Sequence, residues 1–178
     1  MSLEASFGTA PDSLQAQNLS LRPEEAADEE SLRELYIRHR WAEFAPLPWP
    51  DAQKAALIAK QFALQQRQHR ANWPQSVRLV VTGTDGIAGR LHLAETADNL
   101  HIIDILLDVP LRGQGTGSSL IGALIDRAGA SRTLTLSVDK NNPAQNLYRR
   151  LGFVEAADLG QAWQMRRPMH AQTSSAAR

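Results

Sequence analysis

Hydrophobic and polar positions divide the chain into a helical first part and a strand-rich second part. Between residues 28 and 72, apolar side chains recur every three to four positions, which is the spacing of one helix face. From residue 77 onward, short apolar runs of strand length alternate with polar or glycine-containing turns. The pattern predicts helices first and a sheet after them.

Two helices are expected in the first part. One follows the acidic run Asp28–Glu30, whose charges suit the positive end of a helix dipole. Prolines at 46, 48 and 50 then interrupt the chain. A second helix is expected to begin at Asp51 and to end before the pair Trp73-Pro74, because a residue that precedes proline disfavours helical geometry.

The second part predicts a mixed sheet. Its expected strands are 77–82, 87–93, 100–107, 133–138, 153–156 and 161–166. The first two flank GTDG, which is typical of a β-hairpin, and the third follows after a polar turn. An amphipathic helix over about 116–128 separates the third strand from the fourth, which predicts a parallel, right-handed crossover. Another helix begins near Pro143 and ends at Leu151-Gly152. The expected class is α/β, or more narrowly α+β with a mixed sheet.

The ends of the chain lack this periodicity. At 178 residues, the length favours one domain of ordinary size. We expect a flexible N-terminal arm over residues 1–18, a single domain over 19–168 and a C-terminal tail over 169–178.

Composition narrows the function classes. Lysine plus arginine and aspartate plus glutamate both number 19, and no basic cluster occurs, so nucleic acid is not an expected partner. No apolar run is long enough to cross a membrane, and the absence of cysteine excludes disulfides and thiol catalysis. No spacing of histidine and acidic residues suggests a metal site. The cytoplasm is the expected location, and the sequence is compatible with either a monomer or a homodimer.

The most informative motif is RGQGTG, Arg112–Gly117, which joins an apolar strand to an amphipathic helix. Such a join leaves backbone N–H groups unpaired at the positive end of a helix, where a phosphate binds well. The loop has no lysine for a Walker A motif, and Ser118 stands where a dinucleotide fingerprint needs its third glycine. A tight turn that uses glycine only for its backbone freedom is the alternative.

This turn and a later segment together resemble the GCN5-related N-acetyltransferase (GNAT) family. The matching pattern is Arg112-x-x-Gly115-x-Gly117, followed by N-x-x-A-x-x-L-Y-x-x-L-G-F from Asn141 to Phe153. In that family the first motif holds the pyrophosphate of acetyl-CoA, and the second forms the helix along which the pantetheine runs. The resemblance includes the strand IIDILLDV, extends more weakly to LRP near the N-terminus, and covers Leu19 to Arg167.

The resemblance implies the acyl-CoA N-acyltransferase fold, with the sheet splayed at the cofactor site. It also implies an N-acetyltransferase that moves an acetyl or short acyl group from acetyl-CoA to a primary amine, by direct attack of the amine on the thioester. The acceptor is not identified. A non-catalytic acyl-CoA-binding sensor or interaction module is the alternative from a different class.

Cofactor contacts follow from the same resemblance. The residues implied are Ile105, Leu107, Arg112, Gly113, Gln114, Gly115, Thr116, Gly117, Ser118, Asn141 and Tyr148. Ile105 and Leu107 would act through backbone groups, if their strand separates from the strand 133–138. Asn141 keeps the family's three-residue step to Ala144, whereas the adjacent Asn142 could cap the helix.

Three further side chains are candidates for the chemistry. Tyr148 suits a general acid for the departing thiolate, and its alternative is a tyrosine that only packs. Asp104 interrupts an apolar strand, so it either serves the acceptor amine or anchors a neighbouring segment through an ion pair. Glu43, between the expected helices, could meet a cationic acceptor.

Overall fold

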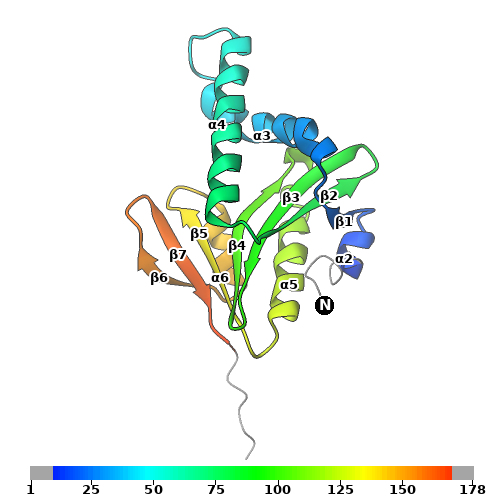
Figure 1. Cartoon of the computed structure of the whole chain (residues 1–178), viewed down its shortest axis with the longest axis vertical. Coiled ribbons are helices and arrows are strands. Elements are labelled where there is room, and N and C mark those ends of the chain that lie inside the picture. Colours follow the sequence, from blue (N-terminus) through cyan, green and yellow to red (C-terminus); the bar gives the residue numbers. More distant parts are fainter. Residues whose placement is uncertain (1–9, 170–178) are drawn as a thin grey trace, which may run out of the picture.

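Seven strands form one sheet in the computed structural model, which describes residues 10–169 (Figure 1). The strands are β1 (Ser20–Pro23), β2 (Val77–Gly83), β3 (Gly86–Glu95), β4 (Asn99–Leu107), β5 (Thr133–Asp139), β6 (Val154–Asp158) and β7 (Ala162–Arg167). Their order is β1-β2-β3-β4-β5-β7-β6. Only the β4–β5 pair in the described sheet is parallel, as the strand–helix–strand pattern predicts.

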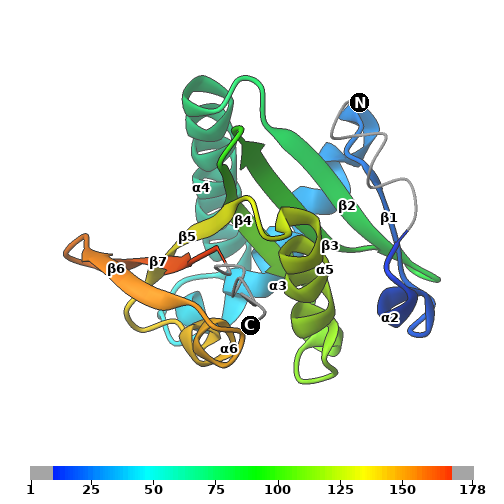
Figure 2. The ribbon, with the colours of Figure 1, turned by 90° about the horizontal axis from the view of Figure 1, so that it is seen from below.

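Helices cover both faces of the sheet (Figure 2). On one face lie α3 (Glu29–Phe44) and α4 (Asp51–Asn72), and on the other lie α5 (Thr116–Ala128) and α6 (Ala144–Arg150). Two short 3₁₀ turns, η1 (Ala26–Asp28) and η2 (Val109–Leu111), precede α3 and follow β4. The predicted mixed α/β class is confirmed. No helix in the described range is long and apolar enough to span a membrane.

The alternation of side chains along the strands produces two separate cores. On the α5 face, Leu91 and Leu93 of β3 pack with Leu120 and Leu124 of the helix. On the opposite face, Val80 and Leu106 pack against the apolar sides of α3 and α4. The α3–α4 face also buries polar residues of β3, namely Arg90 and His92.

One extra residue in β4 reverses this alternation partway along the strand. His92 pairs with Asp104 but Leu93 pairs with Ile102, so Ile103 is a β-bulge with no partner in β3. Before the bulge the even-numbered residue Ile102 faces the α5 core. After it the odd-numbered residues face that core, and Asp104 is therefore turned toward α3 and α4, as Leu106 is.

The sheet opens at the same point. The β4–β5 ladder ends with Ile102 opposite Leu136, while β5 continues to pair with β7 as far as Asp139 opposite Ala162. Figure 1 shows β5 and β7 leading away from β4 beyond this point. The expected separation of the two parallel strands is confirmed, and it leaves the β5-facing edge of residues 103–107 without a strand partner in the described sheet.

The expectation of a flexible N-terminal arm is wrong for residues 10–18. Residues Asp12–Gln15 form a short helix, α2, and Leu14 is 0 % exposed in the α5-face core. The hydroxyl of Thr116 donates a 2.6 Å hydrogen bond to Gln17 Oε1, which fixes this segment to the start of α5. Residues 1–9 of the expected arm and 170–178 of the expected tail lie outside the described range.

Leu14→Ala should lower the free energy of unfolding by about 2–5 kcal/mol, because it leaves a cavity between α2 and α5. Urea denaturation followed by circular dichroism measures the change. Leu64→Ala is the matched control, since Leu64 on α4 is 48 % exposed, and it should alter stability by less than about 0.5 kcal/mol. Equal stability of the parent and Leu14→Ala would show that residues 10–18 add nothing to the fold.

Candidate active site

The turn before α5 presents a row of unpaired backbone donors. The N–H groups of residues 113 to 118 have no hydrogen-bond acceptor among the described residues, and the first helical hydrogen bond runs from Ser119 N–H to the Gly115 carbonyl. Gly113 and Gly115 have φ values of +73° and +84°, which glycine adopts without strain. A Cβ at either position would meet open space. These donors converge where the helix dipole favours an anion.

Two contacts hold this turn against α3. The Arg112 guanidinium donates a 2.7 Å hydrogen bond to His39 Nδ1. Burial, followed by the charge of Arg112, lowers the pKa of His39, so its ring is neutral and accepts this bond. Asp108 pairs with Arg38 at 2.8 Å and also accepts from the N–H of Val109. Arg112 itself is exposed at the mouth of the turn.

The polar side chains of the motif differ in availability. Gln114 donates to the Pro110 carbonyl at 2.6 Å, so its amide braces the turn. Thr116 is fully buried and its hydroxyl is directed to Gln17, which leaves only its backbone N–H for a ligand. Ser118 is exposed and its hydroxyl has no partner among the described residues.

Three elements converge at Gly117. A Cβ at this glycine would lie 3.2 Å from Leu147 Cδ2 of α6 and 3.7 Å from Leu107 Cδ1 of β4. Ile105 and Leu107 are half-buried and pack on the α5-face core, so their side chains are structural and only their backbone borders the gap. The start of α5, the open part of β4 and the middle of α6 therefore enclose one region.

The two adjacent asparagines that precede α6 make different hydrogen bonds. Asn142 Oδ1 accepts a 2.9 Å hydrogen bond from the N–H of Ala144, the first residue of α6, which is the type of contact that a capping side chain makes. Asn141 is exposed, and its N–H donates to Asp139. Gln145, which the sequence did not single out, is buried and donates to the Asp139 and Lys140 carbonyls, so it fixes the β5–α6 turn.

Tyr148 and Asp104 are electrostatically coupled. Tyr148 is 5 % exposed, and its ring lies 5.8 Å from that of Phe153, so part of its role is packing. Burial first, and then the charge of Asp104, raise the pKa of Tyr148 to about 12. The phenol is therefore protonated at neutral pH, and a carboxylate from the opened strand is near enough to affect its ionisation.

Asp104 forms an ion pair whose partner the sequence did not reveal. Its Oδ2 lies 3.7 Å from Nη2 of Arg90, whose side chain is 1 % exposed. On its other side the Arg90 Nε lies 3.7 Å from Glu24 Oε2. With its amide turned so that the oxygen faces the guanidinium, Gln66 accepts a hydrogen bond from Arg90. Asp104 therefore has a structural partner, as one of its two interpretations requires.

Glu43 does not join these groups. Its carboxylate pairs with Arg40 through two nitrogens, both at 2.6 Å, and its side chain is 55 % exposed. Arg40 also donates to the Tyr36 hydroxyl. The negative charge expected to meet a cationic acceptor is already balanced by a neighbour on the same helix.

His92 lies beside Asp104 in the β3–β4 ladder and is fully buried. Its Nε2 is 2.6 Å from Ser76 Oγ, and the Ser76 hydroxyl donates its proton to the Trp73 carbonyl at 2.7 Å. His92 Nε2 must therefore carry the hydrogen, and Nδ1 is a bare nitrogen with no hydrogen-bond partner in the described structure. Burial and the charge of Arg90 lower the pKa of His92 to about 3.

Comparisons with known proteins agree on one family. Residues 34–153 match the model of the acetyltransferase (GNAT) family, and no curated protein matches the sequence. The structure resembles PaiA N-acetyltransferase from Thermoplasma acidophilum with coenzyme A, at 15% identity and TM-score 0.61, covering 84% of this chain and 98% of that one. It also resembles ribosomal-protein-S18-alanine N-acetyltransferase from Escherichia coli, at 21% identity and TM-score 0.59, covering 90% and 99% of the two chains.

A third structure is spermidine N-acetyltransferase from Vibrio cholerae in complex with CoA and spermine. It is 20% identical with a TM-score of 0.57, covering 84% of this chain and 95% of that one. At these identities the similarity concerns the fold alone.

We expect His92 to stay neutral from pH 5 to 8. Its pKa lies near 3 in the folded chain and at about 6.5 when unfolded. The unfolded state therefore binds more protons between these values, so this residue's contribution to stability is complete above pH 6.5 and is lost as the pH falls toward 3. Nitrogen-15 NMR of the imidazole should show no titration above pH 5 in the folded protein, and titration near 6.5 in urea. A folded-state midpoint between 5.5 and 7.5 would contradict the assignment.

Proposed function

The chain belongs to the GNAT acetyltransferase family, and we propose that it is an N-acetyltransferase that moves the acetyl group of acetyl-CoA to a primary amine. The observation that carries the proposal is the combination of two features at one place. Unpaired donors at the start of α5 adjoin the stretch of β4 that has separated from β5. A phosphate group and an extended amide chain are the ligand parts that these two features suit.

These two features define where each part of acetyl-CoA would bind. Its pyrophosphate binds the N–H groups of residues 113–118, with the exposed Arg112 and Ser118 beside them. Its pantetheine continues between the open edge of β4 and helix α6, and pairs there with backbone groups of Ile105 and Leu107. Asn141 lies exposed at the α6 end of this path.

Acetyl transfer then proceeds by direct attack. The neutral amine forms a C–N bond with the thioester carbonyl carbon, and backbone N–H groups of the open β4 edge stabilise the oxyanion. As the C–S bond breaks, the thiolate takes a proton from Tyr148. The amine loses its proton to Asp104, directly or through one water.

The coupling between the two side chains gives these proton transfers an order. Burial and, after it, the negative charge of Asp104 raise the pKa of Tyr148, which makes the phenol a weak acid. Once Asp104 has accepted the amine proton its charge is removed, and the phenol becomes a stronger acid when the thiolate departs. The proton released at the amine thus promotes protonation at sulfur.

The acceptor is proposed only as a primary amine. Asp104 is turned toward α3 and α4, so the amine approaches from that face of the sheet. Ribosomal-protein alanine and spermidine, named for two of the similar structures, illustrate the range of amines. A cysteine-free chain suits the reducing cytoplasm, where we place the reaction.

Gly115→Trp should weaken CoA binding by at least about tenfold, since the indole would occupy the open space in front of the amide donors. Isothermal titration with CoA measures the affinity. Gly160→Trp is the matched control, because Gly160 has φ of +83° and equally open surroundings in the β6–β7 turn. An unchanged CoA affinity in Gly115→Trp would remove the cofactor assignment.

Thiol release from acetyl-CoA with a panel of polyamines, amino acids and peptides should identify an acceptor, and Tyr148→Phe should then lower kcat by about 10²–10⁴-fold. The phenylalanine ring keeps the contact with Phe153, so CoA affinity and melting temperature should stay near those of the parent. If the parent binds acetyl-CoA but transfers to no amine, the chain is a binding module. An unslowed acetyl-transfer step in pre-steady-state kinetics would exclude Tyr148 as the acid.

A further inference from the structure

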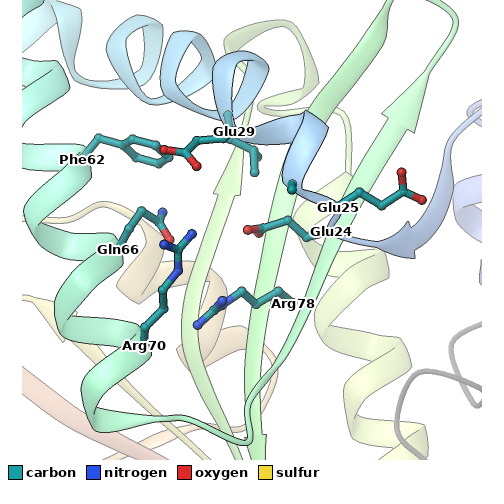
Figure 3. A pocket seen from close by; sticks show the side chains of 9 residues that line it. Glu24, Glu25, Glu29, Phe62, Gln66, Arg70 and Arg78 are labelled. Carbon is teal, nitrogen blue, oxygen red and sulfur yellow. The ribbon is translucent and has the colours of Figure 1, made fainter.

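A cavity of about 240 Å³ lies between the sheet and the α3–α4 layer, on the side away from β5 (Figure 3). The residues around it come from the end of β1, from η1, α3 and α4, and from the first residues of β2. None of them belongs to β4, β5, α5 or α6, which form the proposed acetyl-transfer site.

Opposite charges line different walls of this cavity. Glu24 and Glu29 contribute carboxylates from the β1–α3 side, whereas Arg70 of α4 and Arg78 of β2 contribute guanidinium groups. Figure 3 shows Glu24, Arg70 and Arg78 directed into the space, while the carboxylate of Glu25 points away from it.

These charges form no direct hydrogen bonds to one another, although the charge of Glu24 acts on Arg78 from a distance. Arg70 and Arg78 form no hydrogen bond or ion pair within the described residues, and the buried Nε of Arg78 has no acceptor there. Glu24 Oε2 is also buried without a hydrogen-bond donor, since its contact with Arg90 is 3.7 Å long. Buried charged atoms that lack a hydrogen-bond partner are unfavourable, so Glu24 Oε2 and Arg78 Nε can each gain from a ligand group of opposite charge.

The side chain of Arg90 separates the cavity from the acetyl-transfer site. It is 1 % exposed and lies between Glu24, on the cavity wall, and Asp104, on β4. A ligand in the cavity therefore does not reach Asp104 unless this buried arginine moves.

We propose that this cavity is a binding site for a small zwitterion, a free α-amino acid with an apolar side chain. The ammonium group pairs with Glu24 and Glu29, and the carboxylate pairs with Arg78 and Arg70. Leu32 and Phe62, which are 1 % and 3 % exposed, line the cavity from the α3–α4 core, and the apolar side chain contacts the part of them that is accessible. A dicarboxylate would face Glu24, and a polyamine would face Arg78, so neither satisfies both walls.

The test is isothermal titration with L-leucine, followed by the other proteinogenic amino acids. L-leucine should bind with one site per chain. Two analogues each keep one charge: 3-methylbutylamine has only the ammonium group and 4-methylpentanoate only the carboxylate. Each should bind at least about tenfold more weakly, because one charged wall is then left unpaired. The proposal is wrong if no amino acid binds, or if one analogue binds as well as leucine.

Variants locate the bound amino acid. Arg78→Gln and Glu24→Gln should each weaken leucine binding at least about tenfold. Glu29→Gln provides a second acidic variant on the exposed helix surface, in case Glu24→Gln unfolds. Arg67→Gln on α4 and Glu34→Gln on α3 are matched controls, since both side chains are exposed and lie outside the cavity.

The acetyl-transfer site is tested separately. Asp104→Asn should change leucine affinity less than the cavity variants do, because Asp104 does not line the cavity and acts on Glu24 only through Arg90. If Asp104→Asn abolishes leucine binding while the cavity variants retain it, leucine occupies the acceptor site and the proposed second site is refuted. These titrations contain no acetyl-CoA, so their outcome does not depend on acetyl transfer.

Discussion

The extra residue Ile103 in β4 controls two properties of the sheet at once. It reverses which side chains face each core, and it coincides with the end of the ladder between β4 and β5. Without it, strict alternation would place Asp104 on the α5 face and Ile105 under α3 and α4. With it, a carboxylate reaches the α3–α4 side at the position where the backbone of β4 becomes unpaired. The position of Asp104 and the unpaired edge of β4, which we propose to serve the acceptor and the cofactor, thus arise from one local irregularity.

An open edge in the middle of a sheet is unfavourable unless its backbone groups find partners. The fold keeps this gap open by supporting its borders independently. Gln145 fixes the turn on the β5 side, and Arg38 and His39 hold the glycine turn on the β4 side. Gly117 lets α5, α6 and β4 approach closely at the base of the gap. In the function that we propose, a bound pantetheine would complete the hydrogen bonding that the separated strand lacks.

Features that depend on local sequence were predicted correctly, whereas several features that depend on contacts between distant residues were not. Strong local periodicity located the helix Thr116–Ala128, and the glycine motif before it located the turn whose N–H groups the structure leaves unpaired. The four-residue helix α2 was missed because its stability comes from packing Leu14 into a distant core. The bulge was missed because a one-residue shift does not change the apolar character of IIDILL. The partner of Asp104 was missed because Arg90 is contributed by another strand.

The buried arginine relates the polar groups on the α3–α4 face to one another. A guanidinium that is 1 % exposed needs compensation, and Glu24 and Asp104 provide it from opposite sides. Both contacts are 3.7 Å, longer than a hydrogen bond, so Asp104 is attracted to Arg90 but its oxygens stay available as acceptors. Burial, together with this positive charge, lowers the pKa of His92 and keeps its ring neutral, so His92 carries no positive charge opposite Asp104 in the β3–β4 ladder. Asp104 is therefore coupled both to a buried cation and to the Tyr148 phenol. In the mechanism that we propose, a proton taken up from an amine would remove the negative charge of Asp104 and so favour release of the phenolic proton.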